Sequence, residues 1–156
     1  MNWDAIGAVS EIVGAAAVVI SLMYLAVQIR NQNAESKAGA MRDISEAFRA
    51  SSAIFTDGEL AEIFVKATAD FGSLSDTETI RFISAMHPVL RVFEEAFNQR
   101  LRGRLDDDLW EGINRQYSSY LSAPAIQEYW KIRRNHYTDR FQRFVDDMER
   151  TEWGLE

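Results

Sequence analysis

The chain has 156 residues, 17 Lys and Arg against 24 Asp and Glu, a formal net charge of −7 and 47% apolar residues. This length suits one domain or a small domain with an appendage, and the apolar content is too high for a disordered chain. The acidic balance argues against a nucleic-acid binder, because neutralising phosphates requires an excess of Lys and Arg. The absence of cysteine excludes disulfides, thiol catalysis, iron–sulfur clusters and Cys-based zinc sites.

The N-terminal segment is strongly apolar. Residues 12–29 (IVGAAAVVISLMYLAVQI) carry no charge, and extending the segment back to Ile6 adds only Glu11. About twenty helical residues cross a hydrocarbon core of roughly 30 Å. We therefore predict that residues 1–30 form a transmembrane anchor in contact with membrane lipid. The alternative is a buried helix of a soluble bundle, because Ala and Gly make the segment less hydrophobic than a Leu-rich span.

The charges that flank this segment predict its orientation. Arg30, Lys37, Arg42 and Arg49 follow the apolar residues, whereas no Lys or Arg precedes them. That lack of basic residues, together with the length of the apolar run, argues against a cleaved signal peptide. By the positive-inside rule, the N-terminus lies outside and residues 31–156 form a cytoplasmic domain.

Small and polar residues of the span share one helical face. Steps of three and four residues from Asp4 meet five of them: Gly7, Glu11, Gly14, Ser21 and Gln28. Small residues let membrane helices approach closely, and Ser or Gln can hydrogen-bond across the contact. The face is therefore expected to pack on other membrane helices, in a homo-oligomer or with other subunits. A carboxylate in lipid is costly. Glu11 therefore either lines an ion or proton path in an oligomer or forms an ion pair with a partner subunit. The alternative is that it reaches water near the outer surface or is protonated.

The remaining sequence predicts helices only. One long helix is expected to continue from the span to about residue 55, with Gly39 and residues 31–33 as weak points. Asp57 is expected to cap a helix over residues 59–70, and Ser75 with Glu78 forms a capping box for a helix to about residue 101. Pro88 predicts a kink or a junction inside that helix. Further helices are expected over residues 106–121, 125–134 and 139–150. The prediction is an all-α fold, with one transmembrane helix continuing into a cytoplasmic bundle of about five helices.

Catalytic and cofactor patterns are missing from the sequence. The two histidines, His87 and His136, lie in no metal-binding spacing, and there is no phosphate-binding loop or nucleophile elbow. Glu94 and Glu95 point about 100° apart on a helix, so they do not form an acid–base pair. Arg91 is instead expected to pair with Glu95 on the surface, four residues away. We therefore predict a protein that is not an enzyme, with no cofactor or metal, in which His87 has a structural role.

The segment YWKIRRNHY, residues 129–137, interleaves basic and aromatic residues without an acid. It is a candidate for contact with anionic lipid or with a protein partner, through Trp130, Lys131, Arg133 and Arg134. The alternative is that Tyr129, Trp130 and Ile132 belong to the core while the basic side chains are solvated. Stacking on single-stranded nucleic acid is disfavoured by the net charge.

Three stretches, residues 2–33, 90–112 and 129–137, resemble a family of small bacterial proteins of about this length, for which no activity is established. The resemblance implies a single-pass bacterial inner-membrane protein with a helical soluble region, and it implies no functional residue. The leading hypothesis is a non-enzymatic assembly or accessory module. The alternatives are a homo-oligomeric ion channel lined by the face that carries Glu11, and a soluble bundle with a ligand pocket.

Overall fold

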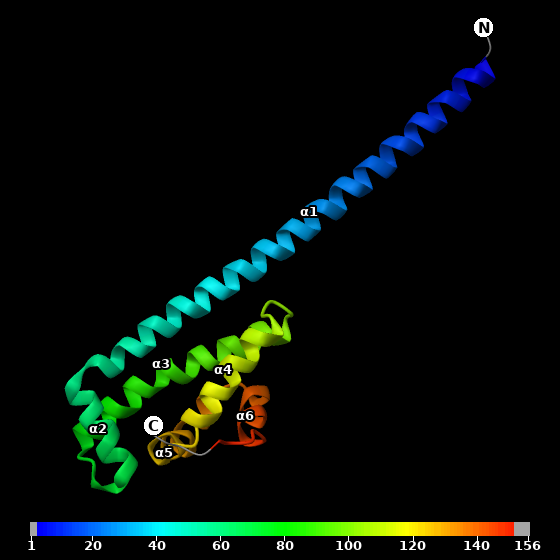
Figure 1. Cartoon of the computed structure of the whole chain (residues 1–156). Coiled ribbons are helices and arrows are strands. Elements are labelled where there is room, and N and C mark those ends of the chain that lie inside the picture. The colour runs from blue at the N-terminus through cyan, green and yellow to red at the C-terminus, as the bar shows by residue number, and fades with distance from the viewer. Residues whose placement is uncertain (1–2, 152–156) are drawn as a thin grey trace. The chain divides into compact units, whose positions relative to one another are not determined.

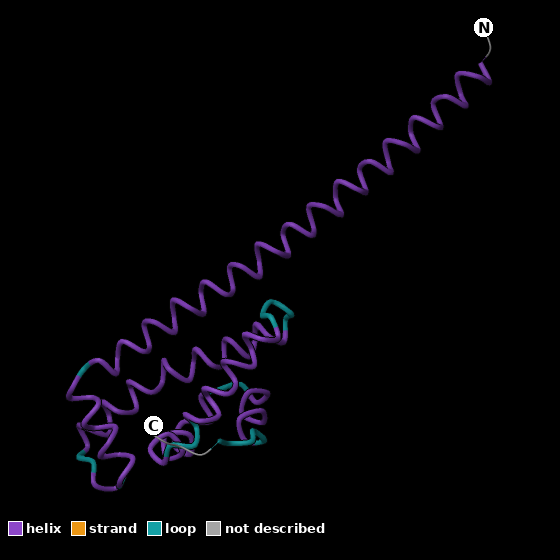
Figure 2. Tube along the Cα trace, in the orientation of Figure 1, coloured by secondary structure: helices purple, strands orange, loops and turns teal. Residues whose placement is uncertain are grey.

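A computed structural model describes the backbone of residues 3–151 and, in this range, all side chains except those of residues 3–10, 12 and 54. The chain divides into two compact units, Met1–Gly39 (the first unit) and Ala40–Glu156 (the second unit). Residues 3–151 contain helices and short turns without a strand (Figure 2). The predicted all-α fold is confirmed.

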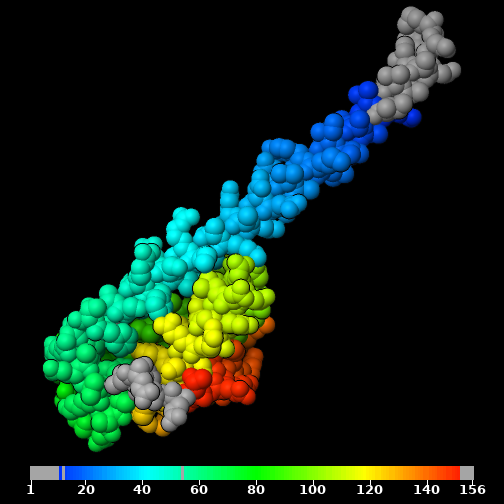
Figure 3. Space-filling view, in the orientation of Figure 1, coloured from blue at the N-terminus to red at the C-terminus, as the bar shows by residue number. Residues whose placement is uncertain are grey.

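Helix α1 spans Trp3–Ala53 without interruption, so the predicted long helix is confirmed and Gly39 does not break it (Figure 1). Every side chain from residue 13 to residue 29 is exposed, including ten large apolar or aromatic ones that are 51–67% exposed. Figure 3 shows one face of this stretch in blue. With a mean hydropathy of 1.8 over eighteen residues, α1 is long and apolar enough to cross a membrane. The last turns of α1 belong to the second unit, where Ala40 and Ile44 are buried.

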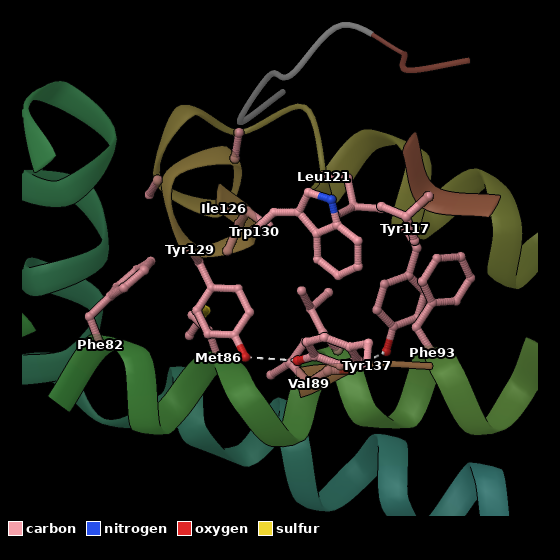
Figure 4. Packing of buried hydrophobic residues seen from close by; sticks show 14 of the residues in the cluster. Phe82, Met86, Val89, Phe93, Tyr117, Leu121, Ile126, Tyr129, Trp130 and Tyr137 are labelled. Atoms are coloured by element: carbon pink, nitrogen blue, oxygen red, sulfur yellow. Dashed lines mark hydrogen bonds between the residues drawn. The ribbon is translucent and has the colours of Figure 1, made fainter. Parts of the chain in front are cut away.

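Five further helices follow in the second unit (Figure 1). They are α2 (Gly58–Ala69), α3 (Asp76–Leu101), α4 (Asp107–Tyr120), α5 (Pro124–Arg133) and α6 (Asp139–Asp146). Helix α3 packs against α2, α4 and α5. Its buried face supplies the centre of the core, where Phe82, Met86, Leu90 and Phe93 are 0% exposed. The Phe93 ring stacks on Tyr117 of α4, with 4.1 Å between ring centroids (Figure 4).

The predicted caps of α2 and α3 are confirmed. The Asp57 carboxylate accepts from the backbone N–H groups of Glu59 and Leu60, and Ser75 and Glu78 satisfy each other's backbone N–H groups in a capping box. Helix α3 is followed by Gly103 at φ +68°. That left-handed conformation strains any residue with a Cβ.

Of the two alternatives predicted at Pro88, the structure excludes the junction, because helix α3 continues through the proline, and the kink stays a prediction. The buried residues before and after the proline hold both halves against the same core, which offsets the lost hydrogen bond. Helix α6 ends at Asp146 rather than near residue 150. The chain beyond it runs along α4, where the Ser118 hydroxyl donates to the carbonyl of Glu149 at 2.6 Å and accepts from the N–H of Thr151 at 3.1 Å.

Candidate functional site

The face of α1 with small and polar residues satisfies its own hydrogen bonds. Ser21 Oγ donates to the carbonyl of Ala17 at 2.8 Å, and Gln28 Nε2 donates to Tyr24 Oη at 2.9 Å. Glu11 is exposed, and no atom of the described chain outside the local helix backbone lies within 4 Å of the place where Gly14 would carry a side-chain carbon. Gly7 belongs to α1 but lies outside the residues whose surroundings are described. This face is therefore open to a partner.

The basic and aromatic segment at residues 129–137 is divided between core and surface. Tyr129 and Trp130 are 0% and 5% exposed, and Trp130 Nε1 donates to Asp146 Oδ1 at 2.9 Å. Lys131 pairs with Glu128 at 2.5 Å, and Arg134 pairs with Asp146. The aromatic rings therefore belong to the core, whereas two of the cations already have acidic partners.

Ile132 and Arg133 of this segment lie nearer the surface. Ile132 is 45% exposed rather than buried with the two aromatic residues. Arg133, in the last turn of α5, is half-buried and has no salt bridge within the part of the chain that the structure describes. Of the four residues predicted to make a surface contact, Arg133 is thus the cation without an acidic partner.

A closed ring of hydrogen bonds, which sequence patterns do not show, joins α3 to α5 and to the turn before α6. Arg91 Nε donates to His87 Nε2 at 3.4 Å, so Nδ1 of His87 carries the proton. Nδ1 donates to Tyr129 Oη at 2.9 Å, and the Tyr129 and Tyr137 hydroxyls are 2.7 Å apart (Figure 4). Tyr137 Oη in turn donates to the carbonyl of His87 at 3.5 Å.

Electrostatic effects keep the side chains of His87, Tyr129 and Tyr137 in this network neutral. Burial lowers the pKa of His87, and electrostatic interactions with Arg91, His136 and Arg133 lower it further. Burial also raises the pKa of Tyr129 and of Tyr137. Both ring nitrogens of His87 are engaged and the tyrosines are weak acids. The arrangement therefore binds three elements together and offers no proton donor or acceptor poised for catalysis.

Glu94 is a buried carboxylate beside this ring. It is 4% exposed, and its Oε1 accepts from the N–H and the Oγ1 of Thr138, at 2.8 and 2.9 Å. Arg91 pairs with Glu94, so the predicted pairing of Arg91 with Glu95 is wrong. The Glu95 carboxylate accepts from Gln99 Nε2 at 2.5 Å instead. The Arg91 guanidinium also lies 4.7 Å from the centre of the Tyr137 ring.

The described residues contain no group of three or more His, Cys, Asp or Glu side chains placed to hold a metal ion. The two features described above are an exposed apolar helix with an open face and a bundle joined by hydrogen bonds and ion pairs. Comparison of the chain with protein-family models, with curated proteins and with solved structures finds no match.

Proposed function

We propose that this protein is a non-enzymatic assembly or accessory module, anchored in the bacterial inner membrane by residues 6–29. The observation that carries the proposal is the exposure of every side chain from residue 13 to residue 29. Removing a large apolar side chain from water stabilises by about 1.5–3 kcal/mol. Ten such side chains in this stretch are more than half exposed, and lipid is the environment that covers them all.

The proposed orientation places the N-terminus outside and the second unit in the cytoplasm. It rests on the basic residues that follow the span, beginning with Arg30 and Lys37, and on their absence before it. The second unit then supplies the interaction surface on the cytoplasmic side.

The open face of α1 is proposed to pack on neighbouring membrane helices. Gly14, Ser21 and Gln28 recur every seven residues, a spacing that keeps one side of a helix against a partner. The space around Gly14 allows a close approach of another backbone. Glu11, exposed on the same face, favours a second candidate function, a homo-oligomeric ion-conducting assembly in which copies of this carboxylate line the path.

One measurement tests the proposal and separates the candidates. The tagged full chain is extracted from native membranes in mild detergent, and its mass and composition are determined by light scattering and mass spectrometry. An accessory module is expected to carry other proteins. Several identical chains without other proteins would favour the ion-conducting assembly, in which Glu11→Gln is then expected to change the current. Recovery of the chain in the aqueous fraction after lysis would contradict both.

The packing face is tested with a pair of variants. Gly14→Leu is expected to detach the partner or disperse the oligomer, because the added side chain holds the two backbones apart. The fold of the Gly14→Leu variant is expected to be unaffected, since no described atom outside the local helix backbone lies near residue 14. Ala16→Leu, on a different side of the same helix, is the control and is expected to leave the mass unchanged. An unchanged mass in both variants would rule out packing through Gly14.

A further inference from the structure

A groove of about 420 Å³ lies wholly within the second unit, between the last turns of α1, α3 and α4. Its lining includes Phe48 of α1, Phe55 of the following turn, Val89 of α3 and Tyr120 of α4. The Phe55 and Tyr120 rings meet edge to face at 6.1 Å. The groove thus has aromatic and aliphatic walls contributed by three helices and a turn.

The tyrosine hydroxyls of the groove are already occupied. Tyr117 Oη donates to the carbonyl of Val89 at 2.9 Å, and Tyr120 Oη donates to Met86 Sδ at 3.0 Å. Burial raises the pKa of both tyrosines, so both stay neutral. These two residues therefore contribute apolar ring surface to the groove.

Three other lining side chains are polar and unengaged. Ser52, Gln116 and Ser119 line the groove, and none of them forms a side-chain hydrogen bond with any residue that the structure describes. Hydroxyl and amide groups can donate to and accept from a ligand's hydroxyl or carbonyl. They supply a small number of polar contacts beside a mainly apolar surface, the usual composition of a small-molecule site.

The described part of the lining is also free of charge. None of the described groove residues is Asp, Glu, Lys or Arg, although 26% of the chain is charged. A charged ligand would lose hydration here without gaining an opposite charge. This charge pattern complements an uncharged ligand.

We propose that this groove binds an uncharged small amphiphile, whose apolar body packs on Phe48, Phe55 and Val89. A hydroxyl or carbonyl group of the ligand bonds to Ser52, Gln116 or Ser119. The volume of about 420 Å³ holds on the order of a dozen water-sized groups at about 30 Å³ each, the size of a ten-carbon alcohol. The inference is independent of the proposed function, because every groove residue lies in the second unit.

The test uses the full chain in lipid nanodiscs and a ten-carbon alcohol that carries a photoreactive diazirine. After illumination, mass spectrometry maps the labelled residues. Labelling is expected on the end of α1 and on α4, at groove residues. Decanol is expected to protect these residues at concentrations about tenfold lower than decanoate or decylamine, because the two charged analogues pay for desolvation.

Two matched variants decide whether the groove itself is the site. Ser119→Trp fills the groove and is expected to reduce labelling of α4 by about tenfold, whereas Ser84→Trp, at an exposed position of α3 outside the groove, leaves it unchanged. If Ser119→Trp fails to fold by circular dichroism, Ser52→Trp at the exposed rim takes its place. Labelling confined to residues 13–29, equal protection by all three competitors, or labelling unaffected by the filling variant would overturn the proposal.

Discussion

Glu94 connects two parts of the sequence that lie 44 residues apart. Its carboxylate accepts from the N–H and the hydroxyl of Thr138, the residue that precedes α6, while Arg91 neutralises its charge. Hydrogen bonds to a charged group contribute about 1.5–3 kcal/mol each, and an unpaired buried donor adds a penalty. The start of α6 therefore depends on a side chain of α3.

Removing this carboxylate is expected to destabilise the protein. Glu94→Ala should lower the free energy of unfolding by about 2–3 kcal/mol, because the N–H of Thr138 loses its acceptor. The adjacent Glu95 is exposed and bonds only to Gln99, so Glu95→Ala should change stability by less than about 0.5 kcal/mol. Denaturant unfolding followed by tryptophan fluorescence measures the free energy of unfolding of both variants. Equal losses in the two variants would contradict a special role of Glu94.

The lowered pKa of His87 predicts a pH dependence of stability. Arg91, Arg133 and His136 disfavour its protonation together with burial, and Glu94 opposes them. The unfolded chain therefore binds a proton at higher pH than the folded chain does. The contribution of His87 to the free energy of unfolding is fully present above its unfolded pKa of about 6.5. It is lost as the pH falls from that value toward the lower pKa of the folded protein.

The variant His87→Asn isolates this effect. Its amide can replace Nδ1 as the donor to Tyr129 but does not titrate, so the loss of stability between about pH 7 and pH 5 is expected to be smaller than in the original chain. The measurement is the free energy of unfolding at both pH values. Identical pH dependence in the two proteins would show that His87 does not contribute. Glu78, whose pKa is lowered to about 2 by Lys66 and Ser75, stays ionised throughout.

At the scale of the helices, two glycines have opposite requirements. Gly103 follows α3 at φ +68°, a conformation that costs about 1–2 kcal/mol for a residue with a Cβ. Gly112 lies inside α4, where an added Cβ would meet no atom within 4 Å beyond the local helix backbone. Alanine is better than glycine there by about 0.5–1 kcal/mol.

Alanine substitutions at these two positions should therefore act with opposite signs. Gly103→Ala is expected to lower the melting temperature, and Gly112→Ala to raise it. Thermal unfolding followed by circular dichroism compares the two variants directly. A shift in the same direction for both would show that backbone conformation does not govern either position.

Sequence reasoning succeeded where the determinants of a helix are local. The caps at Asp57 and Ser75 depend on residues at most three positions away, so spacing alone located them. The residues of the open face of α1 share that face in any regular helix, and their contact with a partner stays a prediction. The exposure of residues 13–29 did not follow from composition, because a membrane span and a buried helix of a soluble bundle share the same apolar pattern.

It failed where a distant residue decides the outcome. Arg91 pairs with Glu94 rather than Glu95 because Thr138 helps fix the Glu94 carboxylate in the core. Helix α6 ends early because Ser118 holds the chain beyond it. The ring that joins His87, Tyr129 and Tyr137 likewise needs three elements in place, and only the tertiary fold brings them together.

At the scale of the whole molecule, the absence of cysteine gives a direct test of the proposed topology. Single cysteines are introduced as Asn2→Cys and Ser84→Cys, and intact cells are treated with a membrane-impermeant maleimide. The expectation is labelling of Asn2→Cys in intact cells and of Ser84→Cys only after lysis, as Ser84 is exposed on the second unit. The reverse pattern would invert the orientation, and labelling of both before lysis would contradict a span.

The hydrogen bonds between Glu94 and Thr138 and between Ser118 and Thr151 form only when the last part of the second unit has been synthesised. The hydrophobic core of this unit is therefore completed late during synthesis. Phe141 and Val145 of α6 are fully buried, and the Phe141 ring lies 5.4 Å from that of Phe93. Chains emerge from the ribosome N-terminus first, so α1 through α5 leave the exit tunnel before these core residues. Until α6 leaves the exit tunnel, the nascent bundle has an uncovered aromatic surface around Phe93, and a ribosome stalled before α6 would present that surface to chaperones and proteases.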